Sequence, residues 1–135
     1  GVAGQVYIWE GDFRPLPLGN IPSSFSRPNL SGVRGLVYSG RRRLEFHPYT
    51  EALPHIDVNG FVEDVTTEPV ASAISDGQGF FEVDVPPGRY RELVREEDRL
   101  WFGRPYLGLP FIPIEVRENS VATVRIDVTW GAIFQ

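Results

Sequence analysis

The chain of 135 residues carries 13 basic and 18 acidic side chains, so its formal net charge is -5 at pH 7. This acidic balance argues against nucleic-acid binding, which needs a basic surface to neutralise phosphates. The lack of cysteine excludes disulfides, a thiolate nucleophile and cysteine-ligated zinc. The length indicates one domain spanning 1–135, and no run of 18 apolar residues that could cross a membrane occurs in it.

The first predicted strand covers residues 4–9. Alternation places Val6 and Ile8 on one face and Tyr7 and Trp9 on the other. Because both faces carry apolar groups, we expect both to be covered.

Short strands and turns are predicted for the rest of the chain. Residues 10–32 contain four prolines, which exclude a helix or a central strand there. Residues 56–65 allow a short hairpin around the turn dipeptide Asn59-Gly60. Further strands are predicted, in chain order, over 33–38, 42–47, 69–75, 80–85, 89–95, 114–116 and 121–130.

The clearest local pattern lies between residues 76 and 90. Gly77 and Gly79 supply the positive-φ geometry of a tight turn, and the next residues alternate apolar and acidic, as a half-buried strand does. Pro86-Pro87-Gly88 ends that strand, because proline cannot donate to a ladder, and Tyr90 opens the next one. This region therefore predicts turn, strand, turn, strand.

The last predicted strand alternates in the same way. Its valines and isoleucine face inward, while its outward positions are Thr123, Arg125, Asp127 and Thr129. Seven or eight short strands at about ten-residue spacing, without an amphipathic helix, predict an all-β domain built as an antiparallel sandwich.

The order of these pieces resembles the carboxypeptidase regulatory-like family. The family pattern is a strand, an Asp-x-x-Gly-x-Phe turn and a Pro-Gly-x-Tyr reversal, and the matching residues are Gly4, Val6, Pro69, Val70, Ala73, Asp76, Gly79, Phe81, Pro87, Gly88, Tyr90 and Val94. The resemblance implies a transthyretin-like, Greek-key β-sandwich of seven or eight strands. One departure is Glu92, which stands where the family has an apolar residue. Either Glu92 lies on an open face, or a bulge turns Leu93 inward.

The resemblance also implies a role and a location. In metallocarboxypeptidases this module is the non-catalytic neighbour of the enzyme, so we expect no enzymatic activity and no cofactor. The chain is similar to single-domain exported proteins of Bacteroidetes-type bacteria, which implies the periplasm, outer membrane or cell surface. A lipid anchor upstream of Gly1 fits that location. The leading hypothesis is a structural or protein-interaction module, whose partner is an unknown protein or a cell-surface glycan.

Two histidine pairs form a candidate metal site. Glu45 and His47, like His55 and Asp57, stand two residues apart, so on extended strands each pair shares a face. Two imidazoles and two carboxylates are a suitable ligand set for a divalent cation. The alternative is that both histidines are loop or rim residues that bind water.

The aromatic residues of the Pro/Gly-rich segment 100–113 form a second candidate. Trp101, Phe102 and Tyr106 could stack on sugar rings, which is the basis of the carbohydrate-binding hypothesis. The alternative is a loop that folds back and caps one open end of the sandwich.

Overall fold

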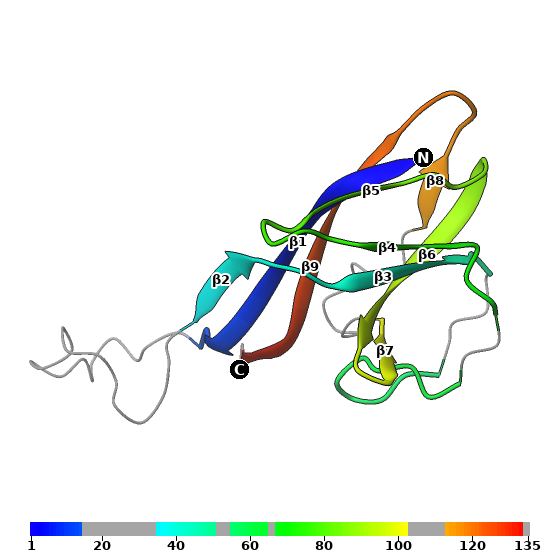
Figure 1. Cartoon of the computed structure of the whole chain (residues 1–135). Helices are drawn as coiled ribbons and strands as arrows, with labels where there is room; N and C mark the ends of the chain where they lie inside the picture. The colour runs from blue at the N-terminus through cyan, green and yellow to red at the C-terminus, as the bar shows by residue number, and fades with distance from the viewer. Residues whose placement is uncertain (15–34, 51–54, 65–66, 103–112, 134–135) are drawn as a thin grey trace, which may run out of the picture.

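The chain forms β-strands in the part that the structure describes. A computed structural model describes residues 1–14, 35–50, 55–64, 67–102 and 113–133 (Figure 1). These ranges contain nine strands and no helix, and hence no helix able to cross a membrane. The strands are β1 (Val2–Asp12), β2 (Leu36–Ser39), β3 (Arg43–Pro48), β4 (Ala71–Ile74), β5 (Phe80–Val83), β6 (Gly88–Glu96), β7 (Arg99–Trp101), β8 (Ile114–Val116) and β9 (Ala122–Ile133).

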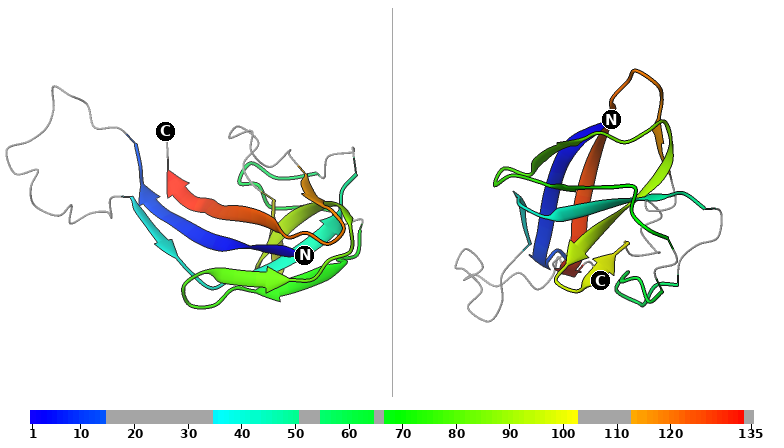
Figure 2. Two further views of the ribbon diagram at one scale, coloured as in Figure 1. Left: turned by 90° about the horizontal axis from the view of Figure 1, so that it is seen from above. Right: turned by 45° about the vertical axis from the view of Figure 1, so that its right-hand side comes forward.

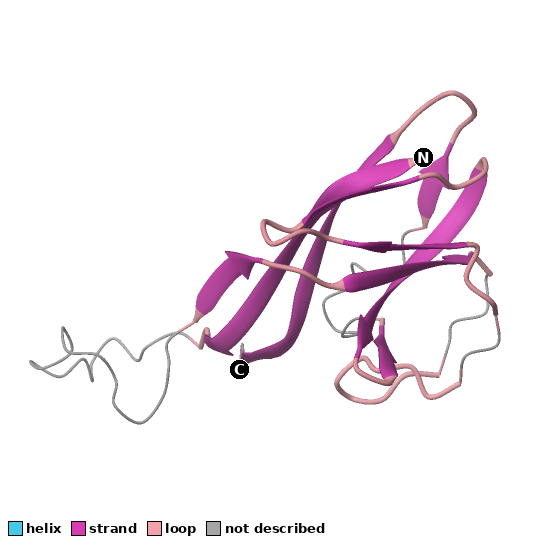
Figure 3. Cartoon of the chain, in the orientation of Figure 1, coloured by secondary structure: helices cyan, strands magenta, loops and turns pink. Residues whose placement is uncertain are grey.

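Two sheets make up the two layers of the molecule (Figures 2 and 3). In sheet A, β1 pairs with β2 and β5 along one side and with β9 along the other. In sheet B, the order is β4-β3-β6-β7, and β8 also pairs with β6. The predicted all-β, two-sheet fold is thus confirmed. Two details differ: β7 lies where a loop was predicted, and β1 and β9 run parallel.

The core lies between the two sheets. The inward positions of the alternating strands supply it, and the largest fully buried apolar side chains are Phe46, Leu44, Val2, Val6, Val94 and Val128. Each such side chain contributes about 1.5–3 kcal/mol by leaving water, so this alternation holds the layers together. A second, smaller cluster of Leu93, Leu100 and Phe102 lies apart from it.

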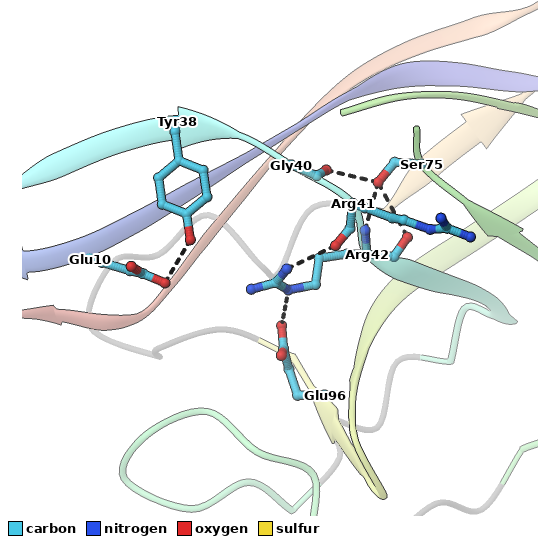
Figure 4. A network of polar contacts seen from close by, with 7 residues as sticks. All are labelled: Glu10, Tyr38, Gly40, Arg41, Arg42, Ser75 and Glu96. Atoms are coloured by element: carbon cyan, nitrogen blue, oxygen red, sulfur yellow. Dashed lines mark hydrogen bonds and ion pairs between the residues drawn. The ribbon is translucent and has the colours of Figure 1, made fainter. Parts of the chain in front are cut away.

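The described strands cross between the sheets four times, at β2–β3, β4–β5, β5–β6 and β8–β9. One serine joins the first two crossings. Residues 40–42 link β2 in sheet A to β3 in sheet B. Ser75 is 1% exposed at the end of β4; its hydroxyl donates to the Gly40 carbonyl (2.9 Å) and accepts from the Arg42 amide (2.7 Å) (Figure 4). The Arg42 side chain pairs with Glu96 at 2.8 Å, which ties the same crossing to β6. The short segment between the predicted strands 33–38 and 42–47 is therefore a crossover between layers.

The predicted 76–79 turn is present and forms the second crossing, although of its two glycines only Gly79 has a positive φ. The Asp76 carboxylate accepts hydrogen bonds from the amides of Gln78 (2.8 Å) and Phe80 (3.0 Å), and Gly79 has a φ of 86°. The Gly79 carbonyl accepts from the Val6 amide at 2.9 Å, so the turn docks on β1. Because β5 pairs with β1 while β4 pairs with β3, the turn joins two layers.

Neither interpretation of Glu92 is correct. The ladder between β3 and β6 has no register shift and pairs Glu92 with Phe46, a fully buried core residue. Residues paired in a ladder face the same side, so Glu92 faces the interior, while Leu93 packs in the second cluster. Burial raises the pKa of Glu92 to about 7.

Thr129 was predicted to face outward, and it is 6% exposed. The register between β1 and β9 shifts between Ile8 and Glu10, so the alternation of β9 breaks at this point. The Thr129 hydroxyl is buried and has no hydrogen-bond partner among the described residues.

At Gly4, β1 lies too close to β9 to leave room for a side chain, and an alanine there is expected to cost about 2–3 kcal/mol of unfolding free energy. A Cβ at this position would lie 2.1 Å from the Val124 carbonyl oxygen, which is backbone and cannot move aside. Gly77→Ala is the matched control, because a Cβ there meets nothing within 4 Å. Urea unfolding of both variants tests this, and equal losses would show that β1 does not need the glycine.

Candidate functional site

Four polar side chains, Thr67, His47, Glu45 and Arg95, form a hydrogen-bonded network on the outer face of sheet B. β3 places Glu45 and His47 there, 4% and 2% exposed. His47 Nε2 lies 3.1 Å from Glu45 Oε1, and His47 Nδ1 lies 3.0 Å from the Thr67 hydroxyl. The other Glu45 oxygen accepts from Arg95 Nε (2.9 Å) and Nη2 (2.6 Å) on β6. Every link satisfies a polar group that burial would otherwise leave unpaired.

The charge balance of this hydrogen-bonded network depends on Arg95. Burial alone would raise the pKa of Glu45, but the hydrogen bonds from Arg95 and His47 outweigh it, and the pKa is lowered. Glu45 is therefore ionised at neutral pH and paired with the guanidinium. An open hollow of about 640 Å³ lies above this network, and Thr67, Glu68 and Arg99 contribute to its wall.

The order hydroxyl, imidazole, carboxylate is also that of an acyl-transfer triad. A triad must present its nucleophile and base to a substrate. Here the His47 ring is 2% exposed. The hydrogen bonds of Glu45 and His47 hold β3, β6 and the segment at Thr67 together.

The four residues of the predicted metal site fall into separate contacts. Glu45 and His47 are together, as described. The His55 side chain is 79% exposed, with Nδ1 3.5 Å from Asp64. Asp57 accepts from the amides of Asn59 and Phe61 and pairs with Arg99 at 2.7 Å, which builds the predicted turn at Asn59-Gly60. Within the described ranges, no three His, Asp or Glu side chains are grouped to hold a metal ion.

The predicted aromatic site is buried where the structure describes it. Trp101 is 6% exposed and donates from Nε1 to the Asn59 carbonyl at 3.0 Å. Phe102 is 5% exposed, and the Arg91 guanidinium lies 5.0 Å from its ring centroid. Tyr106 lies outside the described residues. Neither Trp101 nor Phe102 offers a ring face to a ligand, and both pack as core residues.

The outer face of sheet A carries an open hollow beside an exposed aromatic side chain. We use this name for the face formed by Ala3, Gln5 and Tyr7 of β1, Phe80 and Glu82 of β5, and Thr123 and Arg125 of β9. Ladder pairing brings Gln5 beside both Phe80 and Arg125. An open hollow of about 820 Å³ lies over these residues, and Phe80 is 51% exposed beside it.

The polar groups of this face are held in place by one another. The Arg125 guanidinium lies 4.0 Å from the centroid of the Tyr7 ring. The Tyr7 hydroxyl donates to Gln5 Oε1 at 2.6 Å, and Gln5 Nε2 donates to the Gln78 carbonyl at 2.9 Å. Groups that are already ordered lose little conformational entropy when a partner binds, so this face is prepared for binding.

Two residues of this face could be noticed in the sequence. Tyr7 stands on the second face of the first strand, and Phe80 precedes the inward-facing Phe81. We expected Tyr7 to be covered, and it is half-buried beneath Arg125. Alternation shows that Phe80 points away from Phe81, but not which side is the core.

Comparison of the chain with protein-family models, with curated proteins and with solved structures returned no match. The class of protein is therefore defined by the fold: an all-β protein with two packed sheets.

Proposed function

We propose that this protein is a non-catalytic interaction module of the cell envelope that binds a protein partner through the outer face of sheet A. The observation that carries the proposal is Phe80, a large apolar side chain 51% exposed beside a hollow with ordered polar groups. An exposed aromatic surrounded by polar groups is typical of the centre of a protein interface.

We further propose that the sandwich is of the Greek-key, transthyretin-like kind. The four crossings between layers and the pairing of the first and last strands support this topology. Export to the envelope rests on the sequence resemblance described above and stays a prediction.

A glycan is the second candidate ligand, and its place is the same face. Phe80 could stack on a sugar ring, while Gln5, Glu82 and Arg125 offer amide, carboxylate and guanidinium groups for its hydroxyls. This replaces the earlier hypothesis around Trp101, because that ring is buried.

Phe80→Ser is expected to lower partner affinity at least about tenfold with little change in stability, because exposed interface aromatics contribute roughly 1–2 kcal/mol or more to binding. The measurement uses immobilised wild-type and variant protein to retain partners from envelope extracts, followed by titration of the purified partner. Polysaccharides are titrated in parallel to test the glycan.

Ile74→Ser is the matched control, because Ile74 is 57% exposed on β4 of sheet B. A partner retained by wild type and Ile74→Ser but lost by Phe80→Ser supports the proposal. Equal binding by all three proteins would refute the assigned face, and hydrolytic turnover lost on a single substitution at His47 would refute the non-catalytic role.

A further inference from the structure

The outer edge of β9 along residues 122–129 has no partner strand among the described residues. β9 spans 12 residues, and in the described part of the chain its only ladder is the parallel one with β1. Figures 1 and 2 show β9 at the margin of sheet A, on the side of β1 away from β2 and β5. Residues 122–129 contain no proline or glycine and are rich in β-branched residues, so nothing in them blocks a further strand.

The hydrogen bonds of β1 determine which peptide groups of β9 point outward. The Val6 amide and carbonyl bond to Gly79 and Gly40, so they point toward β5 and β2. Gln5 and Tyr7 therefore point toward β9, where their ladder partners are Arg125 and Asp127. In a parallel ladder such residues bond to the neighbours of their partners, namely 124, 126 and 128. The amides and carbonyls of 123, 125 and 127 are left facing outward.

The charges along this edge are arranged for a second copy running antiparallel. With a two-fold axis at Ile126, Arg125 faces the partner subunit's Asp127, and Asp127 faces the partner subunit's Arg125. In this register Arg125 and the partner subunit's Asp127, whose peptide groups both face outward, stand directly opposite each other. A hydrogen-bonded pair of an antiparallel ladder requires this arrangement. Opposite charges at directly facing positions stabilise an antiparallel pair, and here the two-fold axis makes the ion pair twice.

We propose that two copies of this chain pair through β9 in this register, so that two copies of sheet A become one continuous eight-stranded sheet. Within one copy, Arg125 Nε lies 3.1 Å from Asp127 Oδ1, and the arginine side chain is 58% exposed. The guanidinium has further donors for the partner subunit's carboxylate. This pairing closes on itself and leaves the two outer faces side by side. It does not depend on the function proposed above.

The charge arrangement allows a test by complementation in sedimentation velocity. Wild type is expected to sediment as a dimer. Arg125→Asp alone and Asp127→Arg alone place like charges opposite each other twice, and each is expected to weaken association about tenfold or more. An equimolar mixture of the two variants restores both ion pairs and is expected to form a heterodimer, as is the double variant with itself. A monomeric wild type, or single variants that associate like wild type, would overturn the proposal.

A cysteine test fixes the register without relying on charge. The chain has no cysteine of its own. The two-fold axis places residue 126 opposite itself as a non-hydrogen-bonded pair, where Cα atoms lie about 4.5 Å apart and a disulfide can form. Ile126→Cys is therefore expected to cross-link on mild oxidation. Val124→Cys faces residue 128 of the partner subunit and is expected to stay uncross-linked. Cross-linking at 124 and not at 126 would exclude this register.

Discussion

Replacing Glu92 by glutamine is expected to raise the free energy of unfolding by about 3 kcal/mol at pH 8 and by less than about 0.5 kcal/mol at pH 4.5. The reason is the position of Glu92 opposite Phe46, where burial raises the pKa of its carboxyl from 4.5 to about 7. Ionising this group in the folded state costs free energy that glutamine does not incur.

The direction of the pH dependence follows from proton binding. Between pH 4.5 and pH 7 the folded state holds the proton of Glu92 while the unfolded state has lost it. Stability therefore falls as the pH rises through this window and is level above it. Urea unfolding from pH 4.5 to 8 measures this, and the difference between wild type and Glu92→Gln should grow across the window. Glu82→Gln, an exposed carboxyl on β5, is the control; a difference independent of pH would contradict the inward-facing position of Glu92.

Arg95→Met is expected to cost about 3 kcal/mol of unfolding free energy at pH 7, because it leaves the buried carboxylate of Glu45 without its cation. The Arg95 side chain is 33% exposed, so the loss is placed at the lower end for buried pairs. Without Arg95, burial raises the pKa of Glu45, and the loss should shrink as the pH falls toward 4.5.

Two variants make this prediction specific. In Glu45→Gln combined with Arg95→Met no unpaired charge is left, so the double variant is expected to be more stable than Arg95→Met alone. Arg99→Met breaks an exposed pair with Asp57 and is expected to cost at most about 1 kcal/mol. If the double variant is less stable than Arg95→Met alone at pH 7, Glu45 is not held as a buried anion by Arg95.

The sequence predicted the strands well because alternation is a local property. All eight predicted strands overlap described strands, with ends that differ by at most three residues, and the Asp76–Gly79 turn follows from its own side chains. β7 was missed because two of its three residues open the Pro/Gly-rich segment 100–113, whose composition is typical of a loop. Its backbone pairs with β6, and Leu100 and Trp101 are buried in different clusters, which only the tertiary fold decides.

Which sheet a strand joins could not be predicted, because pairing is a non-local property. The segments at Gly40 and at Asp76 look like hairpin turns, yet each carries the chain between layers. The hydrogen-bond partners of Glu45 and His47 could not be predicted for the same reason. The two-residue spacing correctly placed Glu45 beside His47, but their partners Thr67 and Arg95 lie 20 and 50 positions along the chain. No local pattern connects them.

The outer face of sheet A depends on the same long-range pairing. Gln5, Phe80 and Arg125 come from the beginning, middle and end of the chain and meet only because β1 separates β5 from β9. A substitution that shifts either ladder by one residue would turn this face inward. The face is therefore a property of the sheet and not of a motif.

The most direct test of the account is hydrogen exchange on the complex with a partner retained by the Phe80-dependent assay. The account predicts slower amide exchange on binding in the strand segments of the outer face of sheet A, at residues 3–7, 80–82 and 123–125, with little change in β3. Slower exchange confined to β3 and residues 55–64 of sheet B, with the outer face of sheet A unchanged, would contradict it.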